Sequence, residues 1–139
     1  MTVAWSQAQW LVTPGTPSYR IKSMPLAGGA VTTLDTAAAT PTVLLRGGVV
    51  AWHVLSSDKI TSKLWSQSQG AVVLSPAGST VSSVNSGYAL YSDGTSTRTW
   101  QGTTGASTVR IEGAVSNTQI SNNWIYFTTG DGIYRIPLS

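Results

Sequence analysis

The sequence predicts an all-β fold assembled from several small antiparallel sheets, and three observations lead to this prediction. An aromatic run from Trp124 to Phe127 meets a Gly-Asp-Gly corner at 130–132 and is followed by a second apolar run ending at Ile136, which is the signature of a β-hairpin. Part of this pattern recurs, because the tripeptide Tyr-Arg-Ile occurs at 19–21 and again at 134–136. Charged residues make up only 9% of the chain, and Ser, Thr, Gln, Asn and Gly supply its polarity, which suits twisted sheets and tight turns.

A repeat period fixes the expected architecture. The second strand of each predicted hairpin begins at Tyr19, Ile60, Ser96 and Ile133, so that successive starts are 41, 36 and 37 residues apart. This spacing is close to the roughly 40–45 residues of a four-stranded propeller blade. The sequence therefore predicts a β-propeller-like array of about four blades of four short antiparallel strands, in one domain with units at 1–38, 39–78, 79–114 and 115–139.

Each unit is divided into four expected strands, a to d. Unit one has 2–6, 10–13, 19–24 and 30–35; unit two has 42–46, 49–55, 60–65 and 71–75; unit three has 80–84, 88–92, 96–101 and 107–112. Unit four has 116–120, 124–128 and 133–138, so the last blade lacks its outer strand. Such an array is a small closed ring, half of a ring made by two copies, or part of a larger propeller. Open sheet edges and apolar blade faces favour self-association or pairing with a companion propeller segment.

The b strands carry the strongest burial signal. The runs at 49–55, 88–91 and 124–127 are continuously apolar rather than alternating. Continuous runs are typical of strands covered on both faces, as blades stacked against one another would be.

A family resemblance appears in the same residues. The stretch from Trp124 to Leu138 reads Trp-Ile-Tyr-Phe-Thr-Thr-Gly-Asp-Gly-Ile-Tyr-Arg-Ile-Pro-Leu and resembles the blade motif of YWTD-type and TolB-like β-propellers. Tyr19-Arg-Ile, followed by Pro25-Leu-Ala-Gly-Gly and Val31-Thr-Thr-Leu, resembles the same motif with its outer strand. Unit three departs from it, with Thr-Arg-Thr-Trp at 97–100, and no unit contains Tyr-Trp-Thr-Asp. The resemblance implies an extracellular or periplasmic setting.

Composition excludes several classes of function. The net charge is +3, and the eight Lys and Arg residues are scattered, so no phosphate-binding stripe for nucleic acid is formed. The chain has no cysteine, which rules out disulfides and thiolate chemistry. Neither a signal-peptide pattern nor an apolar run of membrane-spanning length is present.

Three groups of residues are candidates for a site. Asp58, Asp93 and Asp131 fall at equivalent b–c turns, where they serve turn geometry or form a weak cation or ligand ring. Trp65 and Trp100 occupy matching c-strand positions, where they are core residues or a platform for stacking sugars. Trp10, Trp52 and Trp124 are assigned matching b-strand positions, as expected of packing between blades.

His53, the only histidine, is a hydrogen-bonded structural residue or a lone base lining a central channel. A single histidine does not by itself form a catalytic site, and the sequence lacks the Gly-x-Ser-x-Gly motif of serine hydrolases. The expected function is therefore a non-catalytic binding or scaffold module that uses its loop face to hold a protein or other ligand, without catalytic residues, metal or cofactor. The alternatives are a carbohydrate-binding propeller and the non-catalytic propeller portion of a larger hydrolase.

Overall fold

The computed structural model describes residues 2–9, 18–25, 27–37, 42–56, 59–74 and 78–139. Within these residues the fold is all-β, with four antiparallel sheets and no helix. The first sheet contains β1 (Thr2–Gln9), β2 (Ser18–Pro25) and β3 (Thr32–Ala37). The second contains β4 (Thr42–Arg46), β5 (Val49–Ser56), β6 (Lys59–Ser66) and β7 (Gly70–Val73). The third contains β8 (Thr80–Asn85), β9 (Tyr88–Ser92), β10 (Ser96–Gln101) and β11 (Ser107–Glu112), and the fourth contains β12 (Ser116–Ser121), β13 (Trp124–Thr129) and β14 (Gly132–Pro137).

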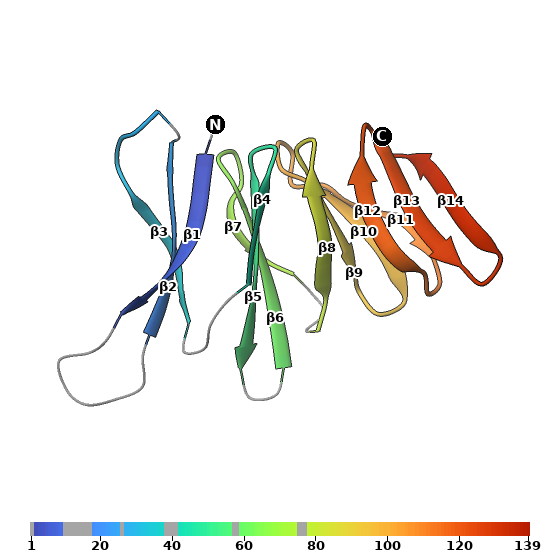
Figure 1. Cartoon of the computed structure of the whole chain (residues 1–139), viewed down its shortest axis with the longest axis horizontal. Helices are drawn as coiled ribbons and strands as arrows, with labels where there is room; N and C mark the ends of the chain where they lie inside the picture. The colour runs from blue at the N-terminus through green and yellow to red at the C-terminus, as the bar shows by residue number, and fades with distance from the viewer. Residues whose placement is uncertain (1, 10–17, 26, 38–41, 57–58, 75–77) are drawn as a thin grey trace.

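The four sheets lie in a row that follows the order of the chain, with the first sheet at one end and the fourth at the other (Figure 1). Inside each sheet, strands that are consecutive in sequence are neighbours, so every connection is a hairpin. Between sheets, β1 contacts β4, β4 contacts β8, and β8 contacts β12. The leading strands of the four sheets therefore follow one another along the row.

The hydrophobic core is divided among the three junctions between successive sheets. The first junction is built by Ile21, Val50 and Trp52, the second by residues that include Ala51, Leu64, Val81, Tyr91 and Trp100, and the third by Leu90, Ile120, Ile125 and Leu138. Each of these side chains is at most 6% exposed. The sheets are thus held together by apolar faces pressed against each other, at about 25 cal/mol for each Å² of apolar surface buried.

Strand β5 shows how one strand serves two junctions. Successive side chains of a strand point to opposite faces, so Val50 and Trp52 meet the first sheet while Val49 and Ala51 meet the third. All four are at most 1% exposed. The predicted continuous burial of this strand is confirmed for 49–52, because a sheet lies on each side of it.

Strand β13 does not show the continuous burial predicted for it. Ile125 is fully buried, whereas Trp124, Tyr126 and Phe127 are only half-buried. The reason is that the third sheet covers one face of the fourth sheet, and within the described residues no sheet covers the other. In the adjoining strand β14, Ile133 is 78% exposed.

The strand predictions for units two to four are confirmed to within two residues. The third sheet matches its predicted strands in 88–92, 96–101 and 107–112 without any difference. Turn residues explain this agreement: Gly47 and Gly48, between β4 and β5, both have positive φ, which glycine adopts without strain. The three strands predicted for the last unit are found as β12, β13 and β14.

The first strand predicted for unit one was too short. Instead of ending at residue 6, β1 runs from Thr2 to Gln9 and pairs directly with β2. Strand β3 lies on the other edge of β2. Residues 10–13, Trp10 included, lie outside the described part. Eight consecutive residue pairs join β1 to β2, twice as many as a four-residue strand would provide.

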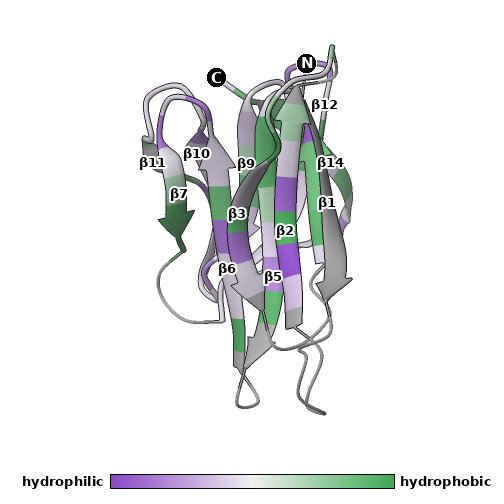
Figure 2. Ribbon diagram, turned by 90° about the vertical axis from the view of Figure 1, so that its left-hand side faces the viewer, coloured by the Kyte–Doolittle hydropathy of each residue, from purple (hydrophilic) through white to green (hydrophobic). Residues whose placement is uncertain are grey.

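The outer face of the first sheet carries positive charge. Ile21 points to the second sheet, so its neighbours Arg20 and Lys22 point to the opposite side. Figure 2 looks onto this sheet, and hydrophilic and hydrophobic bands alternate along β2. In the residues that the structure describes, no helix has the length and apolar character needed to cross a membrane.

Candidate functional site

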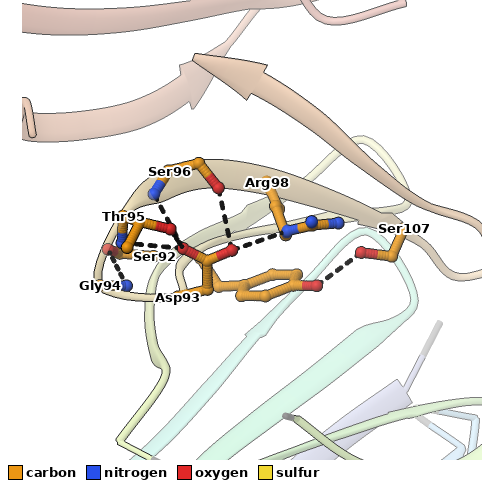
Figure 3. Close-up of polar contacts among 8 residues, drawn as sticks. Ser92, Asp93, Gly94, Thr95, Ser96, Arg98 and Ser107 are labelled. Carbon is orange, nitrogen blue, oxygen red and sulfur yellow. Dashed lines mark hydrogen bonds and ion pairs between the residues drawn. The ribbon is translucent and has the colours of Figure 1, made fainter. Parts of the chain in front are cut away.

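A cluster of polar contacts surrounds Asp93 in the turn between β9 and β10 (Figure 3). One carboxylate oxygen, Oδ1, accepts hydrogen bonds from the backbone N–H groups of Thr95 and Ser96 at 2.9 and 2.8 Å. The other, Oδ2, accepts bonds from the Ser96 hydroxyl at 2.9 Å and from Nε of Arg98 at 2.8 Å. This pattern is that of an Asp side chain closing a turn, and it supports the structural interpretation of Asp93.

The hydrogen bonds around Asp93 favour its ionised form. The backbone N–H of Thr95, the guanidinium of Arg98 and the N–H and hydroxyl of Ser96 together hold the pKa of the Asp93 carboxyl well below its usual value of 3.8. The same hydrogen bond stabilises the charged form of Arg98 and raises its pKa. Both members of the pair are therefore charged at neutral pH.

The depressed pKa makes a prediction for acid stability. The unfolded chain takes up a proton at Asp93 near pH 3.8 while the folded chain does not, so the stabilisation by this carboxylate is present above that pH and is lost as the pH falls toward the folded-state value. Thermal melts of wild type and Asp93→Asn should differ most at neutral pH and converge below about pH 4. Asp131→Asn, at an exposed turn, is the control and should leave the melting temperature unchanged. An Asp93→Asn gap that is the same at pH 7 and pH 3 would contradict the prediction.

A groove of about 400 Å³ opens beside this cluster, between the edge of β7 and the face of the third sheet. Its lining includes Val72, Leu74, Tyr91, Asp93, Arg98, Trp100 and Ser107. The Tyr91 hydroxyl shares a hydrogen bond with the Ser107 hydroxyl at 2.5 Å. The groove thus offers an apolar wall and hydroxyl groups beside an ion pair of zero net charge, a combination that suits a neutral polar ligand better than a strong anion.

The other two predicted aspartates do not join Asp93. Asp131 lies exposed in the turn between β13 and β14, where its backbone N–H donates to the Thr129 hydroxyl at 3.2 Å. Asp58 lies outside the described residues. No group of three or more His, Asp or Glu side chains in the described part of the chain is arranged to hold a metal ion.

The two predicted tryptophans of the c strands differ in exposure. Trp65 pairs with Val50 and Trp100 pairs with Ala89, and both face the preceding sheet, as their matching positions require. Trp100 is only 2% exposed and presents no free ring face, so it is a core residue. Trp65 is half-buried and remains accessible from one side.

Trp65 borders a second hollow, of about 200 Å³, at the end of the second and third sheets opposite the Asp93 turn. The lining contains no charged side chain and consists of Gly47, Gly48, Val49, Trp65, Ser66, Gln67, Ser68, Gly87, Gly102 and Thr103. A methyl group on Gly102 would lie 2.9 Å from a methyl carbon of Val49, so the glycine keeps the strands close here. The hollow is neutral and hydroxyl-rich, and Trp65 lines it although its side chain packs toward the first sheet.

The match predicted for Trp52 and Trp124 was wrong. Trp52 faces the first sheet, whereas Trp124 faces away from the third, next to the inward-facing Ile125. The Arg135 guanidinium carbon lies 4.0 Å from the centre of the Trp124 ring, in a cation–π contact on that outer face. Counted from the turn before each strand, Trp52 corresponds to Phe127 and not to Trp124.

Trp52 belongs to a polar link between the first and second sheets. Its Nε1–H donates to Asp35 Oδ2 at 2.8 Å, and Lys63 Nζ binds the same oxygen at 2.8 Å. Burial alone raises the pKa of the Asp35 carboxyl, but hydrogen bonds from Lys63, Trp52 and the Thr36 backbone outweigh burial and leave that pKa lowered. The carboxylate thus joins two sheets as an ion.

His53 has a structural partner, as one of the two interpretations of the sequence requires. The backbone N–H of Val81 donates to His53 Nε2 at 3.1 Å, which ties β5 to β8. Burial lowers the pKa of His53, and the bond from Val81 also needs an unprotonated Nε2.

This arrangement predicts a loss of stability in mild acid. Because the pKa of His53 is lower in the folded chain than its ordinary value of 6.5, the unfolded chain binds the proton first, and stability falls as the pH drops below about 6.5. The melting temperature should decrease between pH 7.5 and 5.5 in wild type. It should stay level in His53→Gln, whose amide oxygen accepts the same bond without titrating. Equal pH dependence of the two proteins would count against the assignment.

Sequence reasoning missed Arg98, which pairs with Asp93, and the nearby hydrogen bond between Tyr91 and Ser107. Arg98, Tyr91 and Ser107 were not singled out, although Asp and Arg five residues apart across a tight turn meet on one face of a hairpin and could have indicated the ion pair. Ser107 offered no such signal, because it comes from another strand.

Comparison with known proteins adds no family. No family model and no curated protein sequence matches this chain.

Proposed function

We propose that the chain is a non-catalytic binding or scaffold module of the β-propeller type. The observation that carries this proposal is the row of four antiparallel sheets stacked face to face, with leading strands β1, β4, β8 and β12 in succession. The blades of a propeller are likewise small antiparallel sheets packed face to face in succession, around an axis. The YWTD-type and TolB-like resemblance of the blade motif supports the same reading and an extracytoplasmic location.

The use of the polar side chains supports a role without catalysis. His53 holds the backbone of β8, Asp35 joins two sheets, and Asp93 closes a turn. Groups engaged in this way stiffen a scaffold, whereas a general acid or base must be within reach of a substrate. Rigid sheets that present their turns at two ends offer such a module a surface for a protein or other ligand.

Cross-linking tests the propeller arrangement directly. The chain has no cysteine, so Arg20→Cys on the outer face of the first sheet and Tyr126→Cys on the outer face of the fourth introduce the only two thiols. If the row closes face to face, a short bismaleimide should join the two positions. A link within one chain indicates a ring formed by a single copy, and a link between chains indicates a ring formed by two.

Controls make the result decisive. Each single-cysteine variant should give no 20–126 cross-link. Cross-linking the unfolded double-cysteine protein instead of the folded one should also abolish this product. Absence of any 20–126 link in the folded protein, with both thiols reactive toward a small maleimide, would refute the closed propeller.

Carbohydrate binding is a second candidate, favoured by the hollow beside Trp65. The hollow is neutral and is lined by Ser, Thr and Gln residues and by glycines, and Trp65, one of its lining residues, is only half-buried. The Asp93 groove suits a sugar less well, because its aromatic residues Tyr91 and Trp100 are 4% and 2% exposed.

A glycan array followed by calorimetry tests this candidate. Wild type and Trp100→Phe, which keeps an aromatic core residue, should bind the same glycan, whereas Trp65→Ala should lose binding and keep its cooperative unfolding. Binding that survives in Trp65→Ala, or no binding by wild type to any glycan, would reject it.

A further inference from the structure

The outer edge of β14 is the most exposed unpaired strand edge in the described part of the chain. In the second and third sheets, the strand in third position is covered by a fourth, since β6 pairs with β7 and β10 pairs with β11. In the fourth sheet β14 takes the third position, and no described strand pairs with its outer side, where only the Pro137 carbonyl at its end accepts a hydrogen bond, from Arg110. Figure 1 shows β14 at the end of the row.

The register of the hairpin identifies the backbone groups on that edge. Thr129 pairs with Gly132 across a two-residue turn, and pairs in an antiparallel ladder alternate between hydrogen-bonded and non-bonded. Gly132, Tyr134 and Ile136 therefore bond to β13. The N–H and C=O groups of Ile133 and Arg135 point away from the sheet.

Two of the other outer edges are protected in ways that this one is not. Strand β7 is only four residues long, and β11 carries the charges of Arg110 and Glu112. On β14, Ile133 and Tyr134 are 78% and 46% exposed. Its one charge, on Arg135, is held over the Trp124 ring on the face of the sheet.

We propose that β14 pairs antiparallel with β14 of a second copy of this chain, so that two three-stranded sheets become one sheet of six strands. With Tyr134 opposite Tyr134 of the second copy, the outward groups of Ile133 meet those of Arg135 of the second copy, and every outward N–H finds a carbonyl. The arrangement has twofold symmetry.

The side chains agree with this register. Arg135 lies opposite Ile133 of the second copy, so the two arginines are not directly opposed and like-charge repulsion is avoided. The two tyrosines form a close, non-bonded pair, and each already stacks on Phe127 of its own chain, with ring centroids 5.8 Å apart. The second copy supplies the strand that the sheet lacks.

This pairing is independent of the proposed propeller closure, because it needs only the three-stranded fourth sheet. It uses the edge of that sheet, whereas closure through Arg20 and Tyr126 uses sheet faces. Either proposal can therefore be wrong without affecting the other.

Light scattering and sedimentation over a range of concentrations provide the first test. Wild type should have the mass of a dimer. Ile133→Pro removes an outward N–H from each chain while sparing the ladder to β13, and proline is tolerated at such edge positions. It should raise the dissociation constant at least about tenfold. Ile133→Thr, which keeps the N–H, should stay dimeric.

Disulfide trapping provides a second test that does not depend on proline. In the proposed register the Cβ atoms of the two Tyr134 residues are about 4.5–5.5 Å apart, close enough for a bridge after a small adjustment. Tyr134→Cys should form a covalent dimer on mild oxidation, and Ile133→Cys, which faces a different residue, should form far less.

Two results would overturn the proposal. One is a monomeric mass for wild type at all concentrations, which would leave closure within one chain as the alternative for the fourth sheet. The other is a dimer that Ile133→Pro leaves intact and that Tyr134→Cys does not trap, which would assign dimerisation to another surface.

Discussion

Replacing Trp52 by alanine is expected to lower the free energy of unfolding by about 3–5 kcal/mol, the range for truncating a buried aromatic residue. Trp52 is fully buried at the junction of the first two sheets. Its loss leaves a cavity and removes one donor from the Asp35 carboxylate. Urea unfolding should show the change as a lower midpoint, and the melting temperature should fall by about 10–20 °C.

Trp52→Phe separates the two contributions. Phenylalanine fills most of the space but lacks the indole N–H, while Lys63 still binds Asp35. The variant should therefore lose only about 1–2 kcal/mol, most of it for the missing hydrogen bond. Alanine and phenylalanine variants of equal stability would show that packing at this junction contributes little.

Trp100→Ala should be as damaging, and Trp65→Ala should not. Trp100 is 2% exposed among the side chains of the second and third sheets, so about 3–5 kcal/mol should be lost. Trp65 occupies the matching position one sheet earlier but is half-buried, so its truncation should cost about 1–2 kcal/mol. The pair is a matched comparison of the same residue type in equivalent strands.

Chemical denaturation of the two variants provides the measurement. Equal losses would mean that Trp65 is also a core residue, which would weaken its case as a sugar platform. A smaller loss in Trp100→Ala than in Trp65→Ala would contradict the burial seen in the structure.

Local sequence patterns were sufficient to locate most of the strands. Hairpins can be recognised from the sequence near their turns, because residues such as the glycines at 47–48 and the Asp-Gly pair at 93–94 favour turn conformations. Alternation and turn length then set the register of each neighbouring pair. The same logic failed for the first strand of unit one, which was expected to end at residue 6 and instead pairs with β2 over eight residues.

The candidate sites were less predictable than the strands. Asp93 was found because its role is local to one turn. The groove beside it also needs Val72 and Leu74 from the second sheet, which no pattern in the sequence connects to Asp93. Likewise, Trp65 and Trp100 look equivalent in the chain, and only the neighbouring sheets make one accessible and the other buried.

The sequence by itself determined that the chain forms short antiparallel strands joined by tight turns in four successive groups, because hydrogen bonds within a hairpin link residues that are close along the chain. Only the tertiary structure decided how the sheets stack and which face of each is covered. Those features depend on contacts between residues tens of positions apart, and side-chain burial at the three junctions is set by the neighbouring sheet and not by the strand itself.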